Sequence, residues 1–147
     1  MTDVLTWDAP GGPHPARDAA RASMTAVAEG RKDDWLALFA PDALVQDPVG
    51  PSMLDPDGEG HQGAEAIGQF WDANFGAVTR FHFQVKESFA NGPSCANVAT
   101  ITMWLGDSGA TMQVDMVAVY TVGSTGKIAS LRAYWEPERA MATITTP

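Results

Sequence analysis

Apolar residues recur every three or four positions in much of the first half of the chain, which is the spacing of an amphipathic helix. One helix is predicted over Ala16–Ala28, with Gly30 as its stop. A shorter helix is predicted over Asp33–Phe39, because acidic residues favour its start and Pro41 ends it. A third is predicted over about Gly63–Phe75. The first half therefore indicates three helices.

The second half of the chain has the pattern of long strands separated by glycine-containing turns. Its four predicted strands are Phe81–Phe89, Ala96–Leu105, Thr111–Val122 and Ile128–Glu136. A further strand, Ala43–Asp47, is predicted ahead of the third helix, and a loop rich in proline and glycine follows it. This order predicts an α+β fold, in which the three helices close a curved antiparallel or mixed sheet into a cone. A cone of this kind can hold a ligand pocket.

The two ends of the chain are predicted to lie outside this domain. Residues 1–15 contain several prolines and glycines, which disfavour regular structure, so we expect a flexible arm there. Residues 16–138 form the predicted domain, and residues 139–147 form a C-terminal tail. A length of 147 residues suits one domain of this kind.

Charge and composition exclude several classes of partner. Nine basic against eighteen acidic residues give a net charge of −9, so neither nucleic acid nor an anionic membrane is an expected partner. No apolar run is long enough to span a membrane, and no signal peptide is recognisable, which predicts a cytoplasmic protein. Cys95 is the single cysteine, which excludes an internal disulfide and a multi-cysteine metal site.

Three segments of the chain carry a resemblance to a known family. They are DWLALFAPDALVQDPVG (Asp34–Gly50), GAEAIGQFW (Gly63–Trp71) and GKIASLRAYW (Gly126–Trp135). In order and spacing, over roughly residues 16 to 138, they resemble the ketosteroid isomerases. The loop Asp55–Gly58 is similar to that of actinobacterial isomerase-like proteins. The wider group is the nuclear transport factor two superfamily, which includes the SnoaL-like polyketide cyclases.

The resemblance implies a role for Asp47 and also departs from the family in two places. The matching aspartate of the isomerases is the general base, which moves a proton beside a ketone, so neither a cofactor nor a metal is expected. The enolate oxygen formed in that step needs hydrogen-bond donors. Ser23 and Ala118 occupy the positions where the family keeps a tyrosine and a protonated aspartic acid. Tyr120, on the same strand face as Ala118, and Trp71 are candidate replacement donors.

Strand parity and the resemblance together predict the wall of a pocket around Asp47. Its candidate residues are Ser23, Val45, Phe70, Trp71, Met112, Val114, Met116, Ala118, Tyr120, Leu131 and Trp135. Methionine and aromatic side chains suit a large, flat, apolar ligand such as a steroid or a polycyclic polyketide. Asp115 is an odd number of residues from Ala118, so it is expected on the opposite face of the strand.

Three functions are compatible with these residues. The first is an isomerase-like enzyme with Asp47 as its base and a non-standard oxyanion hole. The second is a binding protein that keeps the apolar cone without the chemistry, which the substitutions to Ser23 and Ala118 favour. The third is an enzyme that uses Asp47 for a cyclisation or an elimination. The resemblance also implies a homodimer that pairs through the outer face of the sheet.

Overall fold

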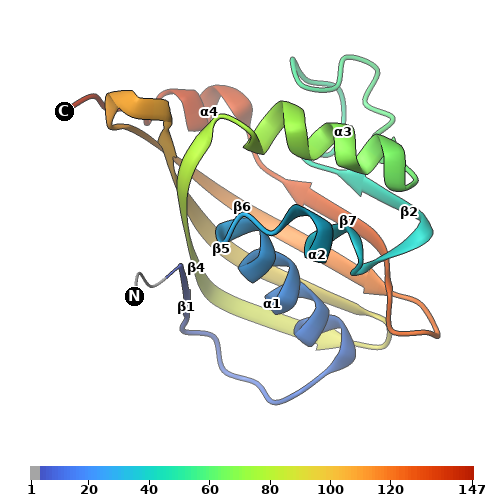
Figure 1. Ribbon diagram of the computed structural model, residues 1–147. Helices are drawn as coiled ribbons and strands as arrows, with labels where there is room; N and C mark the ends of the chain where they lie inside the picture. Colours follow the sequence, from blue (N-terminus) through green and yellow to red (C-terminus); the bar gives the residue numbers. More distant parts are fainter. Residues whose placement is uncertain (1–3) are drawn as a thin grey trace.

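A computed structural model describes residues 4–147 and shows helices packed on one face of a single curved sheet (Figure 1). The sheet has seven strands in the order β1-β4-β5-β6-β7-β2-β3. The strands are β1 (Leu5–Trp7), β2 (Phe39–Gln46), β3 (His61–Gln62), β4 (Val78–Asn91), β5 (Ser94–Leu105), β6 (Ala110–Val122) and β7 (Ile128–Tyr134). The helices are α1 (Pro15–Ala28), α2 (Lys32–Leu36), α3 (Ala64–Phe75) and α4 (Pro137–Met141). The predicted α+β fold is confirmed.

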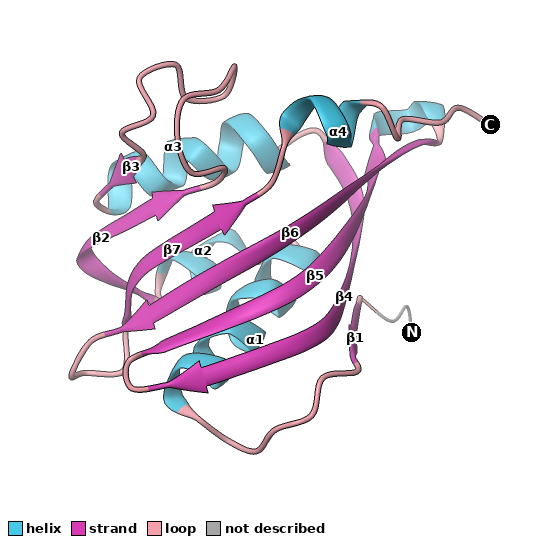
Figure 2. Ribbon diagram, turned by 180° about the vertical axis from the view of Figure 1, so that it is seen from behind, coloured by secondary structure: helices cyan, strands magenta, loops and turns pink. Residues whose placement is uncertain are grey.

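The long strands β4 to β7 are antiparallel neighbours, whereas β2 joins β7 in parallel. Helices α1, α2 and α3 lie on the concave face, while the opposite face is bare except for α4 at one end (Figure 2). This difference explains the alternation along β6, where Val114, Met116 and Ala118 are buried and Asp115 and Val117 are exposed. Side chains of one parity therefore face the helices.

The start of β2 differs from the prediction. Helix α2 ends at Leu36, and β2 begins at Phe39 instead of Ala43. The Phe39 ring packs edge-on against Trp35 at 4.8 Å between ring centroids, which draws this segment into the sheet. Pro41 falls where the pairing of β2 with β7 shifts register, so its missing N–H breaks no regular ladder.

The predicted N-terminal arm is wrong for Leu5–Trp7, which form the parallel strand β1 along Phe83–Val85 of β4. The edge of β4 offers unpaired backbone groups, and hydrogen bonds to these outweigh the disorder expected from nearby prolines. Residues 1–3 of the arm lie outside the described residues. The predicted tail also contains structure, because α4 extends to Met141 and Thr145 pairs with Thr111.

Over residues 4–147, each helix is too short or too polar to cross a membrane.

Candidate functional site

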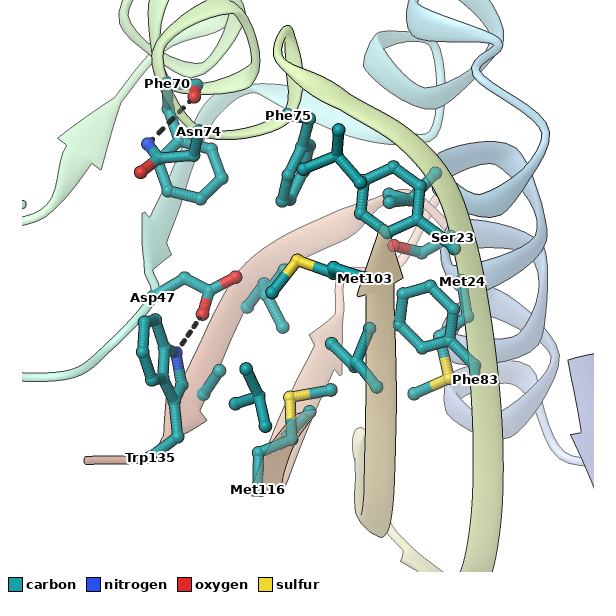
Figure 3. Close-up of a pocket in the computed structure, with 18 of the residues that line it drawn as sticks. Ser23, Met24, Asp47, Phe70, Asn74, Phe75, Phe83, Met103, Met116 and Trp135 are labelled. Carbon is teal, nitrogen blue, oxygen red and sulfur yellow. Dashed lines mark hydrogen bonds between the residues drawn. The ribbon is translucent and has the colours of Figure 1, made fainter. Parts of the chain in front are cut away.

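A cavity of about 270 Å³ lies between the concave face of the sheet and helices α1 and α3 (Figure 3). Its wall is mainly apolar and is formed by side chains from α1, α2 and α3, from β4 to β7 and from the loop after β2. The volume is close to the lower end of the ~300–1,000 Å³ range that is usual for small-molecule sites. The fold therefore provides an apolar site large enough for an organic ligand.

Most of the predicted pocket residues lie on this wall. They are Ser23, Asp47, Phe70, Met112, Val114, Met116, Ala118, Tyr120, Leu131 and Trp135. Those on β6 are separated by two residues each and therefore point to the same face of the strand, so their alternation in the sequence was enough to predict them. Their role in binding a ligand stays a prediction.

Val45 and Trp71 are placed elsewhere, and the prediction that they line the pocket is wrong. Trp71 packs against Trp35 and Phe75, with centroid distances of 5.3 Å to each ring, so it belongs to the core between α2 and α3. Successive residues of a helix differ by about 100°, so Phe70 faces the cavity and Trp71 does not. Val45 is fully buried in β2, on which α3 packs.

The cavity also has lining residues that sequence reasoning did not select. They include Met24, Trp35, Leu54, Asn74, Phe75, Phe81, Phe83, Ile101 and Met103. Phe81 and Phe83 alternate along a predicted strand, and Asn74 lies one helical turn after Phe70, so periodicity is a signal that could have found them. Leu54 comes from an irregular loop, for which the sequence offers no comparable signal.

Asp47 follows the last residue of β2 and is the acidic side chain of the cavity wall. Its Oδ1 accepts a hydrogen bond of 2.5 Å from Nε1 of Trp135, which follows the end of the neighbouring β7. Burial raises the pKa of Asp47 from 3.8 to about 6, and the hydrogen bond from Trp135 opposes that rise. The carboxylate is therefore charged at neutral pH and poised to take up a proton.

The other carboxylate oxygen of Asp47 has no hydrogen-bond donor among residues 4–147 and points toward the cavity in Figure 3. An unpaired carboxylate oxygen is a proton acceptor, and the surrounding apolar side chains keep its basicity high. This arrangement is chemically suited to exchange a proton with a group held inside the cavity.

A second polar group lies on the wall and is formed by two hydroxyls and an indole. The Ser23 Oγ is 2.9 Å from the Tyr120 hydroxyl oxygen, and Nε1 of Trp35 donates to the same Ser23 Oγ over 3.0 Å. Burial raises the pKa of Tyr120, so its phenol stays protonated. Ala118 contributes only a methyl group beside it, as the sequence indicated.

Asp115 lies on the outer face of the sheet, which confirms the parity prediction. It accepts a 2.6 Å hydrogen bond from Thr100 and forms an exposed ion pair of 3.3 Å with Arg139 of α4. This carboxylate is therefore a surface residue and takes no part in the cavity.

Comparison with known proteins identifies the class to which this fold and site belong. Residues 20–131 match the model of the SnoaL-like domain, and the chain belongs to this family. It is 31% identical over 120 residues to the steroid Δ-isomerase of Nocardioides simplex, a match that covers 82% of this chain and 89% of that protein. The predicted relationship to steroid isomerases is therefore confirmed.

Two solved structures are similar over nearly the whole chain. One is the Δ5-3-ketosteroid isomerase of a Mycobacterium species, with a TM-score of 0.79, 30% identity and coverage of 92% of this chain and 100% of that one. The other is RV0760c of Mycobacterium tuberculosis in complex with estradiol-17β-hemisuccinate, with a TM-score of 0.79, 32% identity and coverage of 90% and 99%. The neighbours of this chain thus include both a steroid-converting enzyme and a steroid complex.

Proposed function

We propose that this protein binds a steroid-like or other polycyclic ketone in its cavity and that Asp47 transfers a proton on the bound ligand. The observation that carries the proposal is a basic carboxylate, Asp47, on the wall of an otherwise apolar cavity. The similarity to a steroid Δ-isomerase supports the same chemistry. Such a ligand is recognised by its flat apolar surface, which the methionine and aromatic walls cover.

The reaction that suits this site is the movement of a carbon–carbon double bond next to a ketone. Asp47 removes a proton from the carbon between the carbonyl group and the double bond, and the electron pair moves onto the ketone oxygen to form a dienolate. The protonated Asp47 then returns the proton two carbons further along, which restores the ketone in conjugation with the shifted double bond. Proton and electrons balance within one substrate, so the step requires no cofactor. The oxyanion hole is non-standard, because Ser23 and Ala118 replace the usual donors.

A spectrophotometric assay tests this proposal. A 5-ene-3-ketosteroid is mixed with the protein, and the conjugated enone is followed by its ultraviolet absorbance. We expect turnover by the wild type and by Asp115→Asn, and its loss in Asp47→Asn. Asp115→Asn is the matched control because it removes a carboxylate from the outer face of the sheet. Absence of wild-type turnover, at a sensitivity a thousandfold below a typical ~10 s⁻¹, would reject the isomerase reaction.

A second candidate function is a binding protein without catalysis. The observation that favours it is Ala118, whose methyl group leaves the oxyanion side of the cavity with fewer donors than the isomerases have. Steroid binding by the wild type and by Asp47→Asn with equal affinity, without turnover in either, would support it. The retained base also suits a cyclisation or an elimination, and a polyketide substrate would separate that reaction from isomerisation.

We also propose that two copies of the chain pair through the outer face of the sheet. Val98, Val117 and Tyr134 are neighbours across β5, β6 and β7, and each is exposed there. A row of apolar side chains exposed in the single chain is typical of a surface that another protein chain covers. Sedimentation at micromolar concentration should give a dimer for the wild type and a monomer for Val117→Lys, whereas a wild-type monomer would remove this proposal.

The cytoplasmic location stays a prediction that cell fractionation can test.

A further inference from the structure

The hydrogen-bonded group of Trp35, Ser23 and Tyr120 on the cavity wall has one more hydroxyl hydrogen than it has acceptors within residues 4–147. Ser23 and Tyr120 carry one hydroxyl hydrogen each, and a single contact of 2.9 Å joins the two oxygens. Trp35 can only donate, and its N–H is already directed at Ser23 Oγ over 3.0 Å. No other hydrogen-bond partner of either hydroxyl is found within residues 4–147. One buried hydroxyl hydrogen beside the cavity therefore has no protein acceptor.

The position of Ser23 in α1 bears on which hydroxyl carries this hydrogen. A serine in a helix commonly donates to the carbonyl group four residues earlier, and Thr25 on the same helix does so, over 2.8 Å to Arg21. Ser23 makes no such bond, and its oxygen lies against Tyr120 instead. Either hydroxyl can donate across the contact between Ser23 and Tyr120. When Ser23 donates, the bonds run from the Trp35 N–H to Ser23 and from the Ser23 hydroxyl to the Tyr120 oxygen, and the hydrogen left without an acceptor is that of Tyr120.

We infer that Tyr120 binds the oxygen of the ligand: its hydroxyl donates to the ketone, and to the enolate that the ketone becomes, with Ser23 and Trp35 as positioning residues. The inference rests on the proposed binding of a polycyclic ketone. It assigns to β6 a tyrosine hydroxyl that the related isomerases carry at the position of Ser23 on the first helix. The long side chain of Tyr120 on β6 and the short side chain of Ser23 on α1 meet on the cavity wall, where their oxygens are 2.9 Å apart.

The surroundings of Tyr120 make its hydroxyl an effective donor. A buried hydroxyl donor without an acceptor is unfavourable in an apolar cavity, and a ligand oxygen that accepts its hydrogen bond removes this cost. Hydrogen bonds aligned in one direction polarise each other, so the bonds from Trp35 and Ser23 strengthen the last donor in the chain. The charge on Asp47 adds to the rise in the Tyr120 pKa, which indicates that base and donor influence each other across one cavity. Asp47 and Tyr120 both line this cavity, so a ligand that fills it lies against both residues.

A matched pair of probes tests the donor directly by binding. The ketone 5α-androstan-3-one and its parent hydrocarbon 5α-androstane differ only in one carbonyl group, and the cavity tryptophans Trp35 and Trp135 report binding by fluorescence quenching. For Tyr120→Phe we expect about 3- to 10-fold weaker binding of the ketone, the effect of one neutral hydrogen bond, and unchanged binding of the hydrocarbon. Tyr134→Phe is the control, because it removes the only other tyrosine hydroxyl of the chain, which lies on the outer face.

The infrared stretch of the bound ketone measures the hydrogen bond itself. In the wild type the carbonyl frequency should lie below its value in an apolar solvent, and in Tyr120→Phe it should return to that value. Ser23→Ala should give an intermediate shift, because the Tyr120 hydroxyl remains but has lost its hydrogen bond with Ser23. Ser23→Thr keeps a hydroxyl at this position and should restore the full shift. A merely structural role of Ser23 would leave the frequency of the bound ketone unchanged. In the isomerisation assay, loss of this donor should lower kcat by about 10²–10³-fold.

The outcomes separate this inference from the proposed function. Binding of both probes by the wild type, with Tyr120→Phe weakening the ketone no more than the hydrocarbon and with no shift of the carbonyl frequency, would overturn the inference and leave the proposed binding intact. Failure of the wild type to bind either probe would overturn both. Binding of the hydrocarbon by Tyr120→Phe at wild-type affinity shows that the cavity is still formed, so a loss confined to the ketone supports the inference.

Discussion

Replacement of Asp47 by asparagine should make the protein more stable at neutral pH. Asparagine keeps the shape of the side chain and an oxygen that can accept the hydrogen bond from Trp135, but it never carries a charge. Burial raises the pKa of Asp47 from 3.8 to about 6, and each pKa unit corresponds to 1.36 kcal/mol, so the charged form costs the folded state up to about 3 kcal/mol.

The sign of the effect follows from the direction of the pKa change. Well below pH 3.8 the carboxyl group is neutral in both the folded and the unfolded protein, so the difference in free energy of unfolding between wild type and Asp47→Asn should not change with pH there. As the pH rises from about 4 to above 6, the unfolded chain loses its proton before the folded protein does. The wild type therefore loses stability relative to the variant across this window, and the difference becomes constant above it.

Urea unfolding followed by circular dichroism between pH 4 and pH 8 measures this difference. All other titrating groups are common to both proteins and cancel when the two free energies of unfolding are subtracted. Asp115→Asn is the control, and its exposed carboxylate should change the free energy of unfolding by less than about 0.5 kcal/mol at every pH. A difference for Asp47→Asn that stays flat from pH 4 to 8, or that favours the wild type as the pH rises, would show that the charge on Asp47 does not destabilise the folded protein.

Three further changes are predicted to act on the cavity and the fold. Trp135→Phe removes the N–H that supports the charged carboxylate, so the pKa of Asp47 should rise above about 6, by about one further unit, in a carboxyl ¹³C NMR titration; an unchanged pKa would contradict this. Ala118→Leu places three more carbons in a cavity of about 270 Å³, and isothermal titration should show at least about 10-fold weaker steroid binding with an unchanged circular dichroism spectrum. Arg17→Met removes the guanidinium bonds to the Ser88 hydroxyl and carbonyl, of 3.0 and 3.2 Å, and should lower the free energy of unfolding by about 1–2 kcal/mol in urea. Equal denaturation midpoints for this variant and the wild type would show that these bonds add nothing to stability.

Local patterns in the amino-acid sequence are enough to predict the fold class and the part of the cavity wall that β6 forms. Both depend on local periodicity: a period of two along β6 selects Met112, Val114 and Met116 for the concave face, whichever elements later cover it. The same rule turned Asp115 outward. Family resemblance added Asp47, whose place at the end of a strand no periodicity would have distinguished from an ordinary turn residue.

Local sequence patterns do not show the position of a residue whose surroundings come from several elements of the folded protein. Trp71 is as apolar as its neighbour Phe70, and only the packing of α3 against Trp35 decides which of the two faces the cavity. Likewise, Leu5–Trp7 have no strong pattern of their own. They form a strand because the folded sheet presents an open edge beside them, which is a property of the assembled structure.

The partners of the buried polar groups depend on how the helices and strands pack in three dimensions. Ser23 and Tyr120 are 97 positions apart, and Trp135 and Asp47 are 88 apart, so no local spacing relates them. Their contacts form because α1 lies across β6 and because β7 runs parallel to β2, which brings the ends of these two strands side by side. Periodicity determines which face a side chain occupies, whereas hydrogen-bond partners depend on distances that only the packed helices and sheet establish.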